Sequence, residues 1–390
     1  MSTRTVQVGP KTIKEMNAFQ QELDVIRDEV RSTIGERDAR HIRGILRLVR
    51  GTELVGRSLL MFGWFPPTFL LGAFILGLSK ILENMELGHN VMHGQYNWMN
   101  DPRFQGDTYE WDGTGPASGW RYTHNFVHHT YTNVIGMDRD FGYGMFRLST
   151  ELRWRWFYHP IQFVYMMLMM FFFEYFVSVH ELQTDKLFAG KIKLSDPDVR
   201  PRWEGIKRKA AASLLKEYIL LPALGALLAL PFGKSAEVAM AVASGNFFGS
   251  MVRNVWASAI IFCGHFTDNI YIFHRNSIKN ESKGQWYLRQ ILGSSNISGG
   301  SLLHLMSGNL SHQIEHHIFP DIPANRYREI APRVRAICAK YNVPYNTGVF
   351  AWQLMTMFKR VLRYSLPGGS LKAEHMEITG TEIEGMPEHA

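Results

Sequence analysis

The sequence predicts an all-α, integral membrane helical protein with about four transmembrane helices and a cytosolic helical cap. Long apolar runs alternate with polar segments, and the runs are long enough to cross a bilayer as helices. Charged residues between the runs follow helical periodicity rather than strand alternation. Eight of the sixteen histidines form three short clusters. The mean hydropathy of −0.14 averages these two kinds of segment and so conceals the membrane runs.

Composition narrows the possible partners and the compartment. The 390 residues contain nothing that reads as a linker, so we expect one body. The net charge of +7 suits an anionic membrane surface, an acidic protein or nucleic acid. No basic and aromatic RNA-binding signature accompanies the charge, so we expect no nucleic acid partner. Cys263 and Cys338 are too few for a disulfide framework, which fits a reducing, cytoplasm-facing location.

Residues 1–50 are predicted to form cytosolic amphipathic N-terminal helices. The polar stretch 1–10 lacks the apolar core of a secretory signal, so internal segments must drive membrane insertion. Apolar residues then recur at helical spacing between charged ones, at Phe19, Leu23, Ile26, Val30 and Ile34. Residues 41–50 form a basic amphipathic helix, which suits either a membrane surface or the core of the protein itself.

Residues 51–350 are predicted to form the membrane domain. The apolar run 51–78 is interrupted by Pro66-Pro67, which indicates a helical hairpin rather than one kinked span. The second arm starts near Thr68 and delivers His89 and His93 just beyond the membrane. The polar segment 96–147 is the cytosolic cap and carries the second histidine cluster.

The next segments set the side of the membrane on which each cluster lies. The loop 181–209 is rich in Lys and Arg and is therefore cytoplasmic. Spans at 213–232 and 236–262 return the chain to that side. A full span at 161–179 would place the third cluster on the wrong side, so we interpret 161–179 as an in-plane or half-inserted helix. Arg253 and Glu174 are charges within apolar runs, which are functional or paired by default.

The C-terminal part, 351–390, is predicted to be a helix followed by a polar tail. An amphipathic helix at 326–341 precedes it. Pro367-Gly368-Gly369 opens the tail, which runs to Ala390 and which we expect to be disordered.

The histidine clusters indicate a metal site. Two histidines four residues apart lie on one face of a helix, and each cluster contains such a pair. One pair alone is as well explained by ordinary packing, but three clusters together are not. The clusters comprise His89 and His93; His124, His128 and His129; and His312, His316 and His317.

The number and kind of ligands favour two metal ions. Neutral imidazole binds iron, copper, nickel and zinc, and one zinc needs only three or four ligands. Two ions, each with open positions, would suit a small molecule such as dioxygen. Zinc protease chemistry is disfavoured because Asn90 and Asn125 stand where its motif requires glutamate. Candidates for holding the ligands by hydrogen bonds are Asn125, Asp138, Asp140 and Glu315.

The clusters, the run Gln313–Pro320 and the lead-in Trp120–His124 resemble the membrane fatty-acid desaturases. Among these the chain is similar to the bacterial acyl-CoA group that includes mycobacterial stearoyl-CoA delta-9 desaturases, over about residues 50–350. The resemblance implies a mushroom-shaped helical protein with a non-haem di-iron centre. It also implies dioxygen-dependent insertion of a cis double bond into a long-chain acyl group, as acyl-CoA or an acyl lipid. The implied ligands are His89, His93, His124, His128, His129, His316 and His317, with His265 after the last span.

One ligand position stays open within that resemblance. His312 and Gln313 are adjacent, and family members begin the third cluster with either residue type. We slightly favour His312, because imidazole binds iron better than a carboxamide does. The fused b-type cytochrome domain of some members is absent, so we expect a separate electron donor, a ferredoxin or cytochrome with its reductase.

Two other functions share some of these features. A di-iron membrane hydroxylase acting on acyl or alkyl chains could use the same ligands and would differ in its product. A histidine-rich metal transporter or sensor would need polar residues along several spans, and the spans offer few beyond Arg253 and Glu174. For the enzyme, we expect a protein integral to the cell membrane with its active site facing the cytoplasm.

Overall fold

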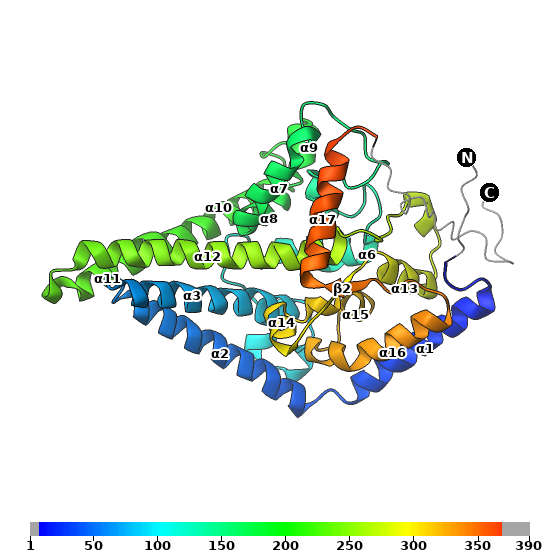
Figure 1. Ribbon diagram of the computed structural model, residues 1–390, viewed down its shortest axis with the longest axis horizontal. Coiled ribbons are helices and arrows are strands. Elements are labelled where there is room, and N and C mark those ends of the chain that lie inside the picture. The colour runs from blue at the N-terminus through cyan, green and yellow to red at the C-terminus, as the bar shows by residue number, and fades with distance from the viewer. Residues whose placement is uncertain (1–7, 369–390) are drawn as a thin grey trace.

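The computed structural model describes residues 8–368. Long helices lie side by side at one end of the molecule, and a broader helical head lies at the other (Figure 1). The long helices are α2 (Glu36–Leu60), α3 (Pro66–Leu82), α10 (Arg200–Leu215), α11 (Leu221–Leu228) and α12 (Ser235–His265). This stalk and head agree with the mushroom shape that the resemblance implies. The expected disordered tail lies outside the described residues, except for its first two.

The hairpin predicted around the prolines is confirmed, although its turn precedes them. Helix α2 ends at Leu60, and Pro66 occupies the first turn of α3, where a missing N–H costs nothing. The two helices pack closely at Gly56 and Gly72. A Cβ on Gly56 would lie 2.8 Å from the backbone nitrogen of Leu76, so only glycine permits this approach.

Helix α2 also settles the two interpretations of residues 41–50. These residues form the first half of one continuous helix, so residue 50 lies inside α2 rather than at an element boundary. Ile42, Ile45 and Val49 are buried and pack with Leu87 and other residues that follow α3 in the chain. The helix therefore covers the core of the protein itself.

The helices α3 and α12 both run toward the head and end there. Helix α3 continues through the π-helical turn η1 (Glu83–His89) into α4 (Asn90–Met92). Three helical runs, Pro66–Met92, Arg200–Leu228 and Ser235–His265, are long and apolar enough to cross a membrane. The second of these runs combines α10, η7 (Lys216–Leu220) and α11.

The segment predicted to be half-inserted is bent. Helix α7 (Gln162–Phe171) follows η6 (His159–Ile161), and α8 (Phe173–His180) leaves it at an angle of 103°. The pair makes a fourth candidate span if it is counted as one, and its bend fits either a broken span or a re-entrant loop. The segment is thus not one straight helix, and the expectation that it is in-plane or half-inserted stays a prediction.

The charges predicted within apolar runs are paired. Arg253 of α12 forms an ion pair with Glu174 of α8. Arg57 of α2 donates to Glu217 at 2.8 Å, and Lys80 of α3 lies 3.5 Å from the same carboxylate. These partnerships hold neighbouring helices together and leave the charges compensated, which is what burial of a charge requires.

The polar cap consists of short helical turns joined by loops. They are η2 (Asn97–Met99), η3 (Pro102–Phe104), α5 (Ala117–Trp120), η4 (Arg121–His128), α6 (His129–Tyr131) and η5 (Gly142–Gly144). Further turns outside the cap are α9 (Thr184–Phe188), η8 (Leu230–Phe232) and η9 (Arg275–Ile278).

The head is built around the third histidine cluster. Its elements are α1 (Ile13–Ser32), α13 (Lys283–Leu292), α14 (Ser301–Met306), η10 (Leu310–His312), α15 (Gln313–Ile318), η11 (Ala324–Arg326), α16 (Tyr327–Lys340) and α17 (Phe350–Ser365). Phe19, Leu23 and Ile26 of α1 are buried in the same cluster as Tyr287 and Phe319. Burial of each such side chain contributes about 2 kcal/mol, which fixes α1 against the head.

Two three-residue strands, β1 (Asn296–Ser298) and β2 (Thr347–Val349), form the only strand pair in residues 8–368 and run parallel. The all-α prediction did not include them. Asn296 starts β1, and its Oδ1 accepts a hydrogen bond from the backbone N–H of Ile314. The strand pair thereby supports the helix that carries the third cluster.

Candidate metal centre

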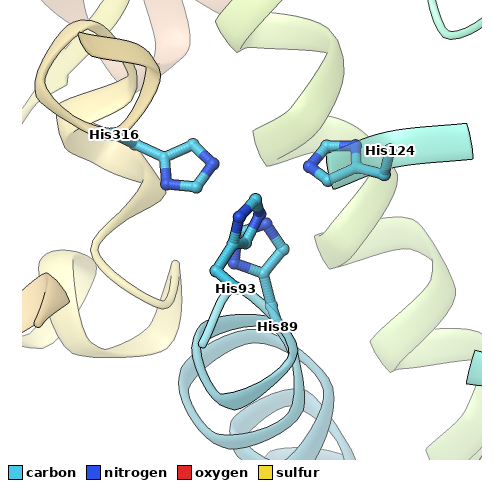
Figure 2. A group of neighbouring side chains, drawn as sticks. All are labelled: His89, His93, His124 and His316. Carbon is cyan, nitrogen blue, oxygen red and sulfur yellow. The ribbon is translucent and has the colours of Figure 1, made fainter. Parts of the chain in front are cut away.

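Four imidazoles converge between the end of the α3 run, the cap and α15. The ligand nitrogens of His89, His93, His124 and His316 all lie within 4.8 Å of one another. Figure 2 shows His89 and His93 rising from one helix, with His124 and His316 facing them from opposite sides. Three segments that are far apart in the sequence thus supply one potential metal site.

A second group lies deeper in the head. His128, His265 and His317 also bring their ligand nitrogens within 4.8 Å of one another, and all three side chains are buried. His129 lies between the two groups, with its ring centroid 4.8 Å from that of His316 and 4.4 Å from that of His317. The eight histidines that the family resemblance implies are therefore brought together.

Local backbone geometry sets where these rings point. His89 ends the π-helical turn η1, and His124 and His128 lie in a second π-helical turn, η4. A π-helical turn shifts side chains relative to an α-helix and is frequent at functional sites. The sequence spacing indicates one face of a helix, but it does not indicate these shifted turns.

Hydrogen bonds on the outer side of several rings fix their orientation. Asp140 lies 2.9 Å from Nδ1 of His124, and both oxygens of Asp138 lie 3.0 Å from Nδ1 of His128. A metal-binding histidine characteristically donates its other ring N–H to such a carboxylate. Asp140 is also close enough to both rings to be a candidate ligand itself. Two of the four expected supporting residues thus contact candidate ligand histidines.

Three further groups support the rings, and no residue pattern indicates them. Gln290 of α13 places Oε1 2.8 Å from Nδ1 of His317 and donates to the backbone carbonyl of His129 at 2.9 Å. Nδ1 of His265 lies 3.2 Å from the carbonyl oxygen of Gly293, and Nδ1 of His316 lies 3.4 Å from the hydroxyl of Tyr327. An isolated glutamine or tyrosine on an amphipathic helix is ordinary, so only the packing of the head reveals these roles.

The inward-facing nitrogens fit metal ions. Nε2 of His93, of His124 and of His316 is buried without any hydrogen-bond partner, as are both ring nitrogens of His129. Burying polar atoms without partners costs free energy, and a cluster of such atoms calls for a ligand. The donor set is almost purely imidazole, which suits iron, copper, nickel or zinc.

Burial of the rings of His124 and His316 also favours metal binding. Burial lowers the pKa of His124 even though it lies beside Asp140, and burial lowers the pKa of His316 well below its usual value. These rings are therefore neutral, which is the form that coordinates metals. Burial acts in the same direction on His128, but the charge and hydrogen bond of Asp138 together with the charge of Asp140 outweigh it and raise the pKa of His128.

The structure separates His312 from Gln313. Helix α15 begins at Gln313, so His312 precedes it with a non-helical backbone and does not share a helical face with His316. The ring of His312 stacks on His304 at a centroid distance of 4.7 Å, outside both histidine groups. Nε2 of Gln313, by contrast, lies 2.9 Å from Nε2 of His265. Gln313 therefore lies beside the second histidine group and His312 does not, whereas the sequence slightly favoured His312.

The other two expected supports contact different groups. Asn125 donates to the backbone carbonyl of Met92 at 2.7 Å and so ties the second cluster to the end of the first. Glu315 accepts hydrogen bonds from Asn296 and Tyr345, each at 2.8 Å. Burial raises the pKa of Glu315 to about 7. Neither side chain bonds a ring in the two histidine groups.

A cavity of about 50 Å³ borders the histidine groups. His89, His124, His128 and His265 line one part of it, and so does Gln313. The remaining lining is largely apolar, including Phe173, Val177, Ile261 and Phe266. The space therefore places an apolar surface directly beside the candidate ligands.

Comparison with known proteins gives a consistent result. A family model described as fatty acid desaturase matches residues 64–349. The NADPH-dependent stearoyl-CoA 9-desaturase of Mycobacterium tuberculosis (strain H37Rv) is 44% identical over 94% of this chain and 83% of its own length. The sn-1 linoleoyl-lipid 6-desaturase of Arthrospira platensis is 27% identical over 71% of this chain and 72% of its own length. An integral membrane helical fold, paired histidine groups and these matches together assign the chain to the fatty acid desaturase family.

Proposed function

We propose that this desaturase uses a histidine-bound di-iron centre and dioxygen to introduce a cis double bond into a long-chain acyl-CoA. The single observation that carries the proposal is the pair of adjacent imidazole groups with buried, unpartnered nitrogens beside an apolar cavity. The name of the mycobacterial relative, a stearoyl-CoA 9-desaturase, supports the choice of acyl group and carrier.

In this proposal the first group would hold one ion through His89, His93, His124 and His316. The second group would hold the other through His128, His265 and His317, with His129 between the groups. Gln313 takes the place for which the sequence favoured His312, because it lies beside His265. Bound iron would supply the activation of dioxygen that removal of two hydrogens from an unactivated chain demands.

The chain's own residues would bind, orient and exclude water. Asp138 and Asp140 hold the rings of His128 and His124 in the tautomer that presents Nε2 to the centre. Phe173, Val177 and Ile261 provide an apolar surface for the acyl chain and keep bulk water away from the reacting carbons. Such positioning decides which carbon pair lies beside the centre.

Metal content and product tests address this function together. Purified protein should contain about two irons per chain, and stearoyl-CoA with dioxygen and a reducing system should yield a cis-monounsaturated product by gas chromatography and mass spectrometry. His316→Ala should abolish turnover while the protein remains inserted in membranes. His274→Ala, at an exposed histidine, provides the matched control.

The possible contrary results are distinct. One tightly bound zinc with no iron-dependent activity would contradict the di-iron centre. A hydroxylated acyl chain as the main product would favour the hydroxylase reaction of the same centre. Loss of membrane-inserted protein in His316→Ala alone would assign that histidine a structural role.

We further propose that the protein lies in the cell membrane with its site facing the cytoplasm, and that a separate ferredoxin or cytochrome with its reductase supplies electrons. The basic segment 181–209 supports this orientation by the positive-inside rule. In a variant that lacks Cys263 and Cys338, the substitution Lys191→Cys introduces a single cysteine. This cysteine should react with a membrane-impermeant thiol reagent only after cell lysis. Labelling in intact cells would reverse the orientation.

A further inference from the structure

A second, larger cavity lies on the cap side of the molecule. Its volume is about 1340 Å³, and its wall comes from the cap loops, from α8 and α9, and from η9. We call it the basic chamber because of its cations. Besides Arg147, which donates to backbone carbonyls of Leu152 and Tyr364, they are Arg139, Arg153, Arg155, Lys186, Lys191 and Arg275. The volume exceeds that of an ordinary small-molecule pocket, so the chamber accepts a large ligand.

The charges of the basic chamber are unbalanced. Within residues 8–368, none of these six cations forms an ion pair. The carboxylates of its wall are Asp138 and Asp185, and Asp138 is already hydrogen-bonded to His128. Surface cations are usually paired or dispersed, so a cavity with this excess would attract an anion of several charges.

The chamber also offers ring faces and a buried donor. Nη1 of Arg139 is buried without a hydrogen-bond partner. The ring of Tyr122 lies 5.7 Å from the guanidinium of Arg139 and 5.6 Å from that of Arg202. Phe188 is 92% exposed at the chamber wall. Guanidinium groups bind phosphates, and exposed rings stack on heterocyclic bases.

The basic chamber adjoins the cavity beside the histidine groups. Tyr143 and His180 line both cavities, and their ring centroids lie 5.2 Å apart. Tyr143 has a left-handed backbone (φ 52°) between Gly142 (φ 71°) and Gly144 (φ 66°). This backbone is costly for tyrosine and turns its buried ring into the shared wall. A ligand with a polyanionic head and a long arm would therefore have its head in one cavity and its arm directed toward the other.

We propose that the basic chamber binds the phosphorylated adenosine diphosphate portion of coenzyme A, with the thioester arm directed past Tyr143 toward the histidine groups. This inference rests on the proposed function and deepens it, because it locates the acyl carrier. The three phosphates of coenzyme A match the unpaired cations, and its adenine matches the exposed rings. A membrane glycerolipid carries a smaller anionic head and no base, so it would leave most of these groups unused.

The test is direct binding, which needs neither turnover nor an electron donor. Purified protein in detergent is titrated calorimetrically with adenosine 3′,5′-bisphosphate and with coenzyme A. Both should bind, and the double variant Arg153→Glu/Arg155→Glu should weaken each about tenfold. Lys14→Glu/Arg40→Glu changes the net charge equally at exposed positions outside the chamber, and it should bind as tightly as the unmodified protein.

Further binding experiments distinguish coenzyme A from other phosphate-containing ligands. Inorganic pyrophosphate should bind more weakly than adenosine 3′,5′-bisphosphate, and equal binding would reduce the chamber to a general anion site and overturn the assignment. Binding of phosphatidylglycerol vesicles that is lost in the Arg153/Arg155 variant, without nucleotide binding, would assign the chamber to lipid instead. If the Lys14/Arg40 control variant binds the nucleotides as weakly as the Arg153/Arg155 variant, the effect is one of net charge, and the coenzyme A assignment is overturned.

A kinetic comparison distinguishes failure of this inference from failure of the proposed function. The unmodified enzyme should show a lower KM for stearoyl-CoA than for stearoyl-pantetheine, which lacks the nucleotide. Arg153→Gln/Arg155→Gln, a milder variant, should reduce this ratio of KM values. Equal KM values in the unmodified enzyme would overturn the chamber assignment while leaving desaturation intact.

Discussion

Gln313 and His312 are neighbours in the sequence but lie in different surroundings. Gln313 contacts His265 within the second histidine group, whereas His312 stacks on His304. The difference arises because α15 begins at Gln313 and leaves His312 outside the helix. Spacing alone permits either residue to pair with a histidine four positions on. The choice depends on where one short helix starts, and residue patterns specify such boundaries poorly.

We therefore expect Gln313→Ala to lose more iron than His312→Ala. Removing a side chain that supports a metal site typically costs about tenfold to a hundredfold in metal affinity, and only Gln313 contacts the groups. Elemental analysis after dialysis against a weak chelator measures the loss in each variant. The opposite ranking would restore the sequence preference for His312 and place it in the coordination set.

Side chains that support the histidines divide into those that the sequence reveals and those that it does not. Asp138 and Asp140 follow the second cluster closely, and two carboxylates near histidines suggest their role. Gln290 and Tyr327 come from α13 and α16, at a distance in sequence that carries no signal. Their contribution depends on tertiary packing of the head, which one sequence does not specify.

At the scale of elements, a buried ion pair joins the start of α2 to the head. Asp38 accepts two hydrogen bonds from Arg326, at 2.6 Å to Nε and 2.8 Å to Nη2, and both residues are buried. Asp38, in the first turn of α2, also accepts a hydrogen bond from the backbone N–H of Gly35, the residue that precedes the helix. The pair thus links the helix that covers the α3 run to the segment after the third histidine cluster.

This ion pair makes stability depend on pH. Burial opposes ionisation of Asp38, but the hydrogen bonds and charge of Arg326, together with hydrogen bonds from Asn325 and Gly35, outweigh burial and lower the pKa. A lowered carboxyl pKa contributes stability above the unfolded value of about 3.9 and loses it as the pH falls through the folded pKa. Asp38→Asn should therefore cost about 3 kcal/mol at pH 7 and progressively less below about pH 4.

Thermal unfolding in detergent at several pH values measures this effect. Asp28→Asn removes a carboxylate from an exposed position on α1 and is the matched control. A loss of stability in Asp38→Asn that is the same at pH 7 and pH 3.5 would show that shape rather than charge dominates the site.

Most elements could be predicted from the sequence, and their irregularities could not. The proline pair indicates the hairpin of α2 and α3, and apolar periodicity indicates α1. The π-helical turns η1 and η4, which carry candidate ligands, leave no such pattern in the sequence. The 103° bend between α7 and α8 lies at Phe172, within a run of three phenylalanines that periodicity alone would continue as one helix.

At the scale of the whole molecule, the net charge of +7 suggests how electrons arrive. Reduced ferredoxins and cytochromes are commonly acidic, so cations near the site would steer them toward it. Steering weakens with salt, because the Debye length falls to about 10 Å at 0.1 M. The basic chamber is a distinct use of charge, since it is concave and suits a ligand the size of coenzyme A rather than a protein.

With saturating acyl substrate, the rate at limiting electron donor should therefore fall as ionic strength rises. The rate at saturating donor should change much less, because encounter no longer limits turnover. Steady-state assays between 0.02 and about 0.2 M salt measure both rates. If neither rate responds to salt, the positive surface serves the membrane or the acyl carrier rather than the donor.

The interleaving of the two histidine groups along the chain has a consequence for biosynthesis. A nascent chain possesses three of the four imidazoles of the first group once residue 124 has been made, whereas the second group has only His128 until α12 is complete. His316 and His317 then close both groups together from a single six-residue helix. In the proposed di-iron centre, metal loading would therefore belong to the final stage of maturation, and a ribosome stalled before residue 316 would leave a chain that is incomplete at both sites.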